Sequence, residues 1–156
     1  MHPTMDEYRQ EVLESLGNFQ VIEFTLKAYL SMCFSIIKQQ TKGLVTYDYS
    51  DKDVLNHSLE RLLILFCKHN SNKELQKLIK DLVDHRNKIA HSAIVHGLLQ
   101  QTFFTGDMTE KIHELHVIND LIIDCRDQLF NEFRDLDSIS KQAGLTSRLA
   151  QTPRQR

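Results

Sequence analysis

Apolar side chains recur every three or four residues along most of the chain, which is the spacing of one face of an α-helix. The pattern predicts a first helix from about Met5 to Lys38, followed by a loop over residues 39–50, where the period breaks. The apolar stripe of this helix is interrupted once, by Glu23. Because an unpaired carboxylate is costly to bury, we expect Glu23 to have a charged partner.

Capping residues mark where the next two helices begin. Asp51 or Asp53 is expected to cap the start of a second helix, which ends at the sequence HNSN, residues 69–72. Ser71, followed three residues later by Glu74, forms a predicted capping box for a third helix. That third helix loses its periodicity near Gly97.

A fourth long helix is predicted after Gly106, with Asp107 as its cap. Its apolar stripe continues to about residue 137, and from Ser138 the pattern decays. We therefore expect one helical-bundle domain over residues 1–137, and either a short helix or a frayed basic tail over residues 138–156.

The scarcity of proline and glycine supports an all-α fold. The two prolines, Pro3 and Pro153, lie at the chain ends, and the five glycines are isolated, without a GxGxxG or GxxxxGK[ST] sequence. Hairpins and phosphate-binding loops depend on these residues, so β-sandwiches, barrels and nucleotide-binding α/β folds are excluded. The expected architecture is an all-α bundle of four to five helices.

Three features favour a cytoplasmic protein. No apolar run approaches the ~20 residues of a membrane span, and the first residues lack the apolar core of a signal peptide. The cysteines Cys33, Cys67 and Cys125 are odd in number and widely spaced, which is typical of buried thiols in a reducing compartment.

Charge is unevenly distributed in a chain whose net charge is only −2. Residues 107–137 carry nine acids and three bases, whereas residues 138–156 carry four bases and no acid. Residues 68–91 hold six bases and three acids, together with three histidines. This last region is where we expect an anion to be favoured.

The densest polar cluster of the third predicted helix is residues 84–91, DHRNKIAH. Arg86 falls on the apolar stripe of that helix, as Glu23 does on the first. Asn87 and His91 are four residues apart and share a face. Arg86 and His91 are five apart, about 140° around a regular helix, so they converge on one atom only if the helix bends or two copies of the segment meet.

These side chains suit metal-free cleavage of RNA. Arginine offers a planar fork for phosphate oxygens and stabilises charge that develops in a transition state. Histidine removes and returns protons near neutral pH, and asparagine can orient the scissile group. Attack by an RNA 2′-hydroxyl on the adjacent phosphate needs a base, an acid and an anion clamp, but no protein nucleophile.

The segment RNKIAH, late in a helix of a small all-α chain, resembles the R-x4-6-H signature of the HEPN superfamily. The resemblance implies a bundle that dimerises so that two motifs line one cleft, and a metal-independent endoribonuclease that uses no cofactor. It also implies a toxin, abortive-infection or other defence role, with an antitoxin as a possible protein partner. Arg86, Asn87 and His91 match the motif, while Glu23 and Lys27 look like the polar pair that some HEPN families place on an early helix.

Simpler interpretations stay open beside this one. Arg86 and Glu23 could form a buried ion pair that fixes helix register, and Glu23 with Lys27 could be an ordinary pair one turn apart. His85 and Lys88 are candidate RNA contacts or part of a solvated face. In a second hypothesis, the chain is a catalytically inactive HEPN-like adaptor or regulator that binds a protein.

Metal chemistry is not expected. His113 and His116, with Glu114 between them, are the nearest approach to a metal-ligand pattern, and no CxxC or HExxH sequence accompanies them. An acidic helix face explains these three residues as well.

Overall fold

The computed structural model describes residues 5–98 and 108–142, with side chains over 5–91 and 109–142. This part of the chain consists of helices joined by short connections, without a β-strand. The helices are α1 (Met5–Gln40), α2 (Lys52–Leu55), α3 (Leu59–His69), α4 (Lys73–Leu98) and α5 (Met108–Gln142). The predicted all-α fold is confirmed.

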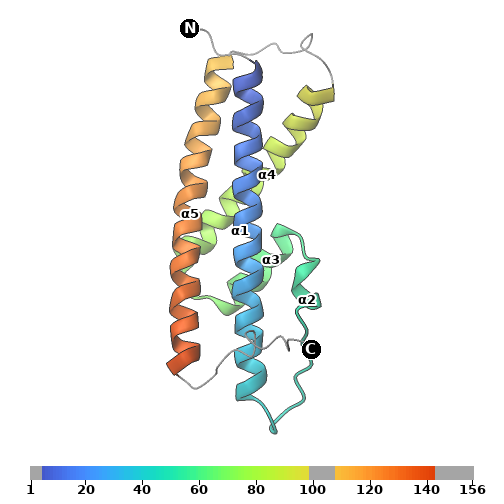
Figure 1. Cartoon of the computed structure of the whole chain (residues 1–156), viewed down its shortest axis with the longest axis vertical. Helices are drawn as coiled ribbons and strands as arrows, with labels where there is room; N and C mark the ends of the chain where they lie inside the picture. The colour runs from blue at the N-terminus through green and yellow to red at the C-terminus, as the bar shows by residue number, and fades with distance from the viewer. Residues whose placement is uncertain (1–4, 99–107, 143–156) are drawn as a thin grey trace, which may run out of the picture.

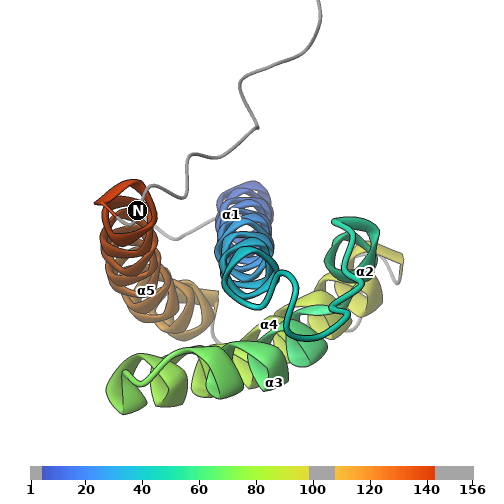
Figure 2. The same ribbon diagram turned by 90° about the horizontal axis from the view of Figure 1, so that it is seen from below.

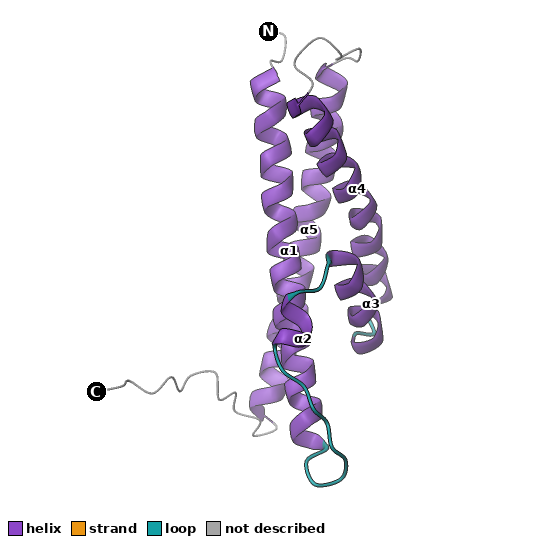
Figure 3. Ribbon diagram, turned by 90° about the vertical axis from the view of Figure 1, so that its right-hand side faces the viewer, coloured by secondary structure: helices purple, strands orange, loops and turns teal. Residues whose placement is uncertain are grey.

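The helices form two layers (Figures 1 and 2). α1 and α5 lie side by side and run in the same direction, because Ser15 contacts Asn119 near one end of the pair and both Tyr29 and Glu132 bond to Asn70 farther along. α3 and α4 cover one side of this pair. α4 runs opposite to α1 and crosses the layer diagonally, from α5 at its N-terminal end to beyond α1 at its C-terminal end (Figures 1 and 3).

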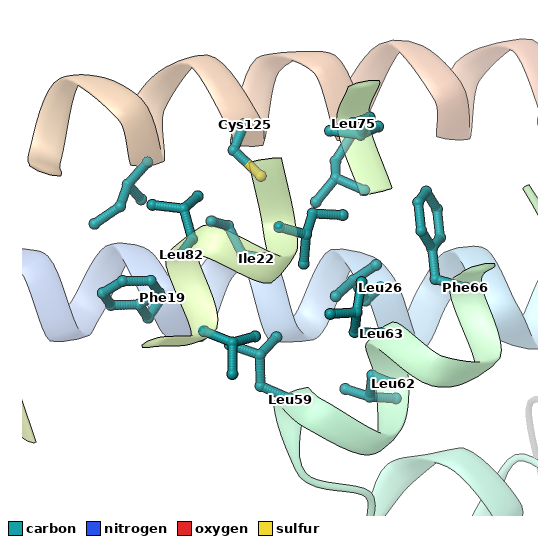
Figure 4. Close-up of a cluster of buried hydrophobic side chains, with 14 of the residues drawn as sticks. Phe19, Ile22, Leu26, Leu59, Leu62, Leu63, Phe66, Leu75, Leu82 and Cys125 are labelled. Carbon is teal, nitrogen blue, oxygen red and sulfur yellow. The ribbon is translucent and has the colours of Figure 1, made fainter. Parts of the chain in front are cut away.

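The apolar stripes of four helices meet between the layers (Figure 4). The fully buried side chains at this centre include Ile22, Leu26, Leu30, Leu62, Phe66, Leu75, Ile79, Leu82, Ile122, Cys125 and Leu129. Each large apolar side chain buried in this way contributes about 1.5–3 kcal/mol relative to exposure. The sequence periodicity therefore identified the faces that form the core.

The predicted second helix is two helices in the structure. α2 is a single turn that ends at Leu55, and α3 begins after Ser58, whose side chain accepts a hydrogen bond from the Arg61 amide. The expectation of one helix starting at residue 51 or 53 and running to 69 was wrong, because Ser58 supplies a second N-cap within it.

The start of α4 also differs from the prediction. Asn72 is the capping side chain, and its Oδ1 accepts a hydrogen bond from the Leu75 amide at 3.1 Å. The Ser71–Glu74 capping box does not form in the structure, since the cap lies one residue later. Asn72 can do this because it is fixed by further bonds to Asn70 and Glu132.

The remaining boundaries follow the pattern closely. α1 ends at Gln40, and the chain then turns through Gly43, whose positive φ of 84° favours glycine. α4 continues to Leu98, and α5 extends past residue 137 to Gln142. Asp107, the predicted cap of the fourth helix, lies outside the described residues, as does most of the predicted basic tail.

α1 is long and apolar enough to cross a membrane, judged by length and composition alone. In the fold it is the helix against which both α5 and the α3–α4 layer pack, and a central core helix has the same apolar composition.

Candidate functional site

The polar cluster of residues 84–91 lies on α4 without any interruption of the helix. Arg86, Asn87, Lys88 and His91 are exposed, and His85 is half-buried. Because the helix continues through the segment, Arg86 and His91 stay about 140° apart around its axis. Their side chains therefore leave the helix in different directions.

Arg86 lies on the core-facing side of α4 but is not buried. Val83 and Ile89 flank it, each about 60° away around the helix, and both are buried. The sequence pattern predicted the angular position of Arg86 on the apolar stripe correctly, but the side chain is exposed and not buried. Its two neighbours reach the core and the Arg86 side chain does not, so this turn of α4 lies at the edge of the core.

Glu23 is paired with Lys27 and not with Arg86. Lys27 Nζ donates to Glu23 Oε1 at 2.7 Å, and the two side chains are 18% and 30% exposed, respectively. Leu82 lies between Phe19 and Ile22 along α1 (Figure 4). From that level Glu23 lies toward the C-terminal end of α1, whereas antiparallel α4 carries Arg86 toward the N-terminal end of α1. The alternative in which Arg86 and Glu23 form a buried ion pair is therefore wrong.

Asn87 links the motif to a second helix. Arg86 Nη1 donates to Asn87 Oδ1 at 3.2 Å, and Asn87 Nδ2 donates to Glu60 Oε1 at 3.1 Å. These two bonds leave the Arg86 guanidinium with free donors. Sequence reasoning missed Glu60, since it stands 27 positions away from Asn87 and no local spacing connects them.

His91 is exposed one turn beyond Asn87 and makes no hydrogen bond or ion pair to another residue that the structure describes. Its imidazole is therefore accessible to a ligand from solvent. Lys88 is also exposed. The motif as a whole is a solvent-facing surface of one helix.

A partly buried polar network fixes the start of α4, and it was also missed in the sequence. Asn70 and Asn72 both donate to the carboxylate of Glu132 on α5, at 2.7 and 2.8 Å, and Asn70 also donates to the Tyr29 hydroxyl at 3.0 Å. The Gln76 side chain donates to the Asn70 carbonyl. Three helices are thereby tied to the α3–α4 connection, which sets the direction in which α4 leaves the core.

Two of the three thiols, Cys33 and Cys125, are unsuited to nucleophilic chemistry. Burial raises the pKa of Cys33 to about 11 and that of Cys125 to about 12, so both are protonated near neutral pH. In the described part of the chain, no group of three or more His, Cys, Asp or Glu side chains is arranged to hold a metal ion. His116 instead contacts Glu11 on α1 at 3.1 Å.

Comparisons of the chain with models of protein families, with curated proteins and with solved structures gave no match. The chemistry and placement of the chain's own residues therefore carry the functional assignment.

Proposed function

We propose that the protein is a cytoplasmic, metal-independent endoribonuclease of the HEPN type that acts as a homodimer. Its substrate is RNA, and its site is Arg86, Asn87 and His91. The observation that carries the proposal is the state of Arg86, an arginine on the core-facing side of its helix that is exposed and has no carboxylate partner among the described residues. Its guanidinium therefore keeps donors free for a phosphate that approaches from solvent.

The proposed reaction is cleavage by the neighbouring 2′-hydroxyl. His91 of one subunit removes the 2′-proton, and the 2′-oxygen attacks the adjacent phosphorus. The bond from phosphorus to the 5′-oxygen breaks, and the His91 imidazolium returns its proton to that oxygen, so one imidazole serves as base and then as acid. The products are a 2′,3′-cyclic phosphate and a 5′-hydroxyl.

Arg86 of the second subunit acts in this scheme as the phosphate clamp, because its free donors can bind the oxygens on which negative charge develops. Asn87 orients the phosphate or Arg86 itself. Glu23 and Lys27 stabilise each other within α1 and lie away from Arg86, so they take no part in the proposed reaction.

The proposed site takes its residues from two subunits. One regular helix separates Arg86 from His91 by about 140°, which favours a clamp and a base that come from different subunits. A twofold axis near α4 would supply two equivalent sites.

Purified protein incubated with a mixture of RNAs in EDTA tests this function. Wild type is expected to cleave, and His91→Ala to lose about 100-fold or more of the rate, as removal of a general base does. His113→Ala, an exposed histidine on α5, is the matched control and should cleave as wild type. Equal cleavage by the His91 variant, or cleavage only with Mg²⁺, would refute the proposal.

A helical adaptor without catalysis is the second candidate. Two large apolar side chains of α1, Leu13 and Phe24, are 70% and 73% exposed, which favours a protein partner on that helix. Expression in cells separates the two candidates. Toxicity relieved by Arg86→Ala supports the nuclease, and toxicity unaffected by changes at Arg86 and His91 supports the adaptor.

A further inference from the structure

The face of α4 that points away from the core carries a row of lysines. Positions 73, 77, 80, 84, 88 and 91 follow one another at helical steps of four and three, and all six are exposed. Four of them are lysines, which we call the lysine ridge: Lys73, Lys77, Lys80 and Lys88. Asp84 is the single acid in the row, and His91 ends it.

The charges of the ridge are not neutralised locally. None of the four ammonium groups lies within 4 Å of a carboxylate of the described residues, and Lys73 donates to the neutral Gln76 side chain at 3.2 Å. Four other cations are paired: Arg9, Lys27, Arg126 and Lys141 each have a carboxylate within 3.2 Å. The exposed lysines Lys38, Lys42 and Lys52 have no such partner among the described residues, as in the ridge. The ridge thus keeps its charge available for an external anion.

The ridge leads directly to the motif. A rise of about 1.5 Å per residue puts Lys73 about 27 Å from His91 along α4 and Lys80 about 16 Å from it. Glu74 and Asp81 lie to one side of the row, and Asn87 lies to the other. A polyanion that follows the ridge therefore arrives at His91 and Asn87.

We propose that the lysine ridge binds the phosphate backbone of single-stranded RNA and guides it to His91; this inference rests on the proposed function. One row of cations on a convex helix matches one row of phosphates, whereas a duplex presents two rows. The ridge has no aromatic side chain, so bases do not stack on it and binding is independent of sequence. The binding energy comes from counterion release and depends strongly on salt.

The test compares two triple variants with the same change in charge. The ridge triple removes the part of the ridge away from the motif, with Lys73→Gln, Lys77→Gln and Lys80→Gln. The control triple removes exposed lysines near the C-terminal end of α1 and on α2, with Lys38→Gln, Lys42→Gln and Lys52→Gln. Both are made in the His91→Ala background, and binding to a fluorescein-labelled single-stranded RNA is measured by anisotropy against KCl concentration.

The ridge triple is expected to bind about tenfold more weakly at ~0.1 M salt and to lose about two units of salt slope, since each phosphate contact contributes ~0.7. The control triple should match its parent within about twofold. Equal binding by the two triples overturns the inference. So does displacement of the RNA by polyglutamate at equal charge concentration, which would assign the ridge to an acidic protein.

Failure of the inference and failure of the nuclease proposal give different results. With His91 intact, the ridge triple should raise KM for RNA about tenfold and leave kcat unchanged, as loss of uniform binding does. Cleavage with an unchanged KM would retain the nuclease and refute the ridge. Binding lost in the ridge triple of a chain that never cleaves RNA would retain the ridge and refute the nuclease.

Discussion

Glu23 Oε1 accepts a hydrogen bond from Lys27 Nζ, 2.7 Å away on the same helix, and this pair accounts for the only acid that interrupts the apolar stripe of α1. Glu23 therefore does not need Arg86 as a partner, and Arg86 is exposed. Arg86→Ala and His91→Ala should each change the free energy of unfolding by no more than about 0.5 kcal/mol, as for other exposed positions. Leu82→Ala, one turn away and buried, should cost about 2–5 kcal/mol.

Urea denaturation followed by circular dichroism measures all three variants. A loss of more than about 2 kcal/mol for Arg86→Ala would mean that the arginine belongs to the core, and would return it to a structural role.

Glu60 should act as a positioning residue through Asn87. Glu60→Ala removes the acceptor 3.1 Å from Asn87 Nδ2, so we expect RNA cleavage to slow by about tenfold through misorientation, while stability is unchanged. Glu60→Gln keeps an oxygen acceptor and should restore most of the rate. In a double-mutant cycle with Asn87→Ala the two effects should be less than additive, and full additivity would show that Glu60 acts independently of Asn87.

The carboxylate of Glu132 should matter more to stability than any surface acid of α5. It accepts from both Asn70 and Asn72, and Asn70 is only 9% exposed, so Glu132→Ala leaves these two donors without their acceptor at the partly buried α3–α4 connection. We expect a loss of about 1–3 kcal/mol. Asp135→Ala, an exposed acid on the same helix, is the control and should be close to neutral.

The protein should lose stability at alkaline pH because buried groups resist ionisation. Burial raises the pKa of Cys125 from 9.0 to about 12 and that of Tyr29 from 10.0 to about 12. The unfolded chain therefore releases these protons first, so the stabilisation is complete below pH 9 and is lost as the pH rises toward 12. A tenfold difference in acidity between the folded and unfolded states corresponds to about 1.4 kcal/mol of stability.

Unfolding midpoints in urea from pH 8 to 11 test this prediction. Cys125→Ala should show a shallower decline than Cys67→Ala, in which a half-buried thiol is removed. Parallel curves for the two variants would contradict the assignment of the loss to Cys125.

The fold was largely predictable because the core obeys a local rule. The apolar positions of α1, α4 and α5 repeat at helical spacing, and side chains such as Leu26, Ile79 and Ile122 are buried as that spacing implies. Helix boundaries were less predictable where several caps compete. Ser58 caps the start of α3 inside a stretch that the sequence predicted as one continuous helix. Asn72 caps α4 in place of Ser71, because Glu132, 60 residues away, holds the Asn72 side chain in position.

The candidate site was predictable in composition and not in surroundings. The order of Arg86, Asn87 and His91 along one helix can be read from the sequence, as can the angle between them. The exposure of Arg86 between buried Val83 and Ile89 depends on how α4 packs, and the contact of Asn87 with Glu60 depends on how α3 packs. Tertiary packing decides both, and no spacing within one helix reports it.

The central claim is that Arg86 and His91 act on one phosphate from two subunits, and a mixed dimer tests it most directly. Arg86→Ala and His91→Ala chains are co-expressed with different tags, and the heterodimer is isolated on both. Each variant alone should be inactive on RNA in EDTA, whereas the heterodimer, with one intact site of two, should regain about half of the wild-type rate. A heterodimer as inactive as its parents, beside an active wild type, would contradict the shared site.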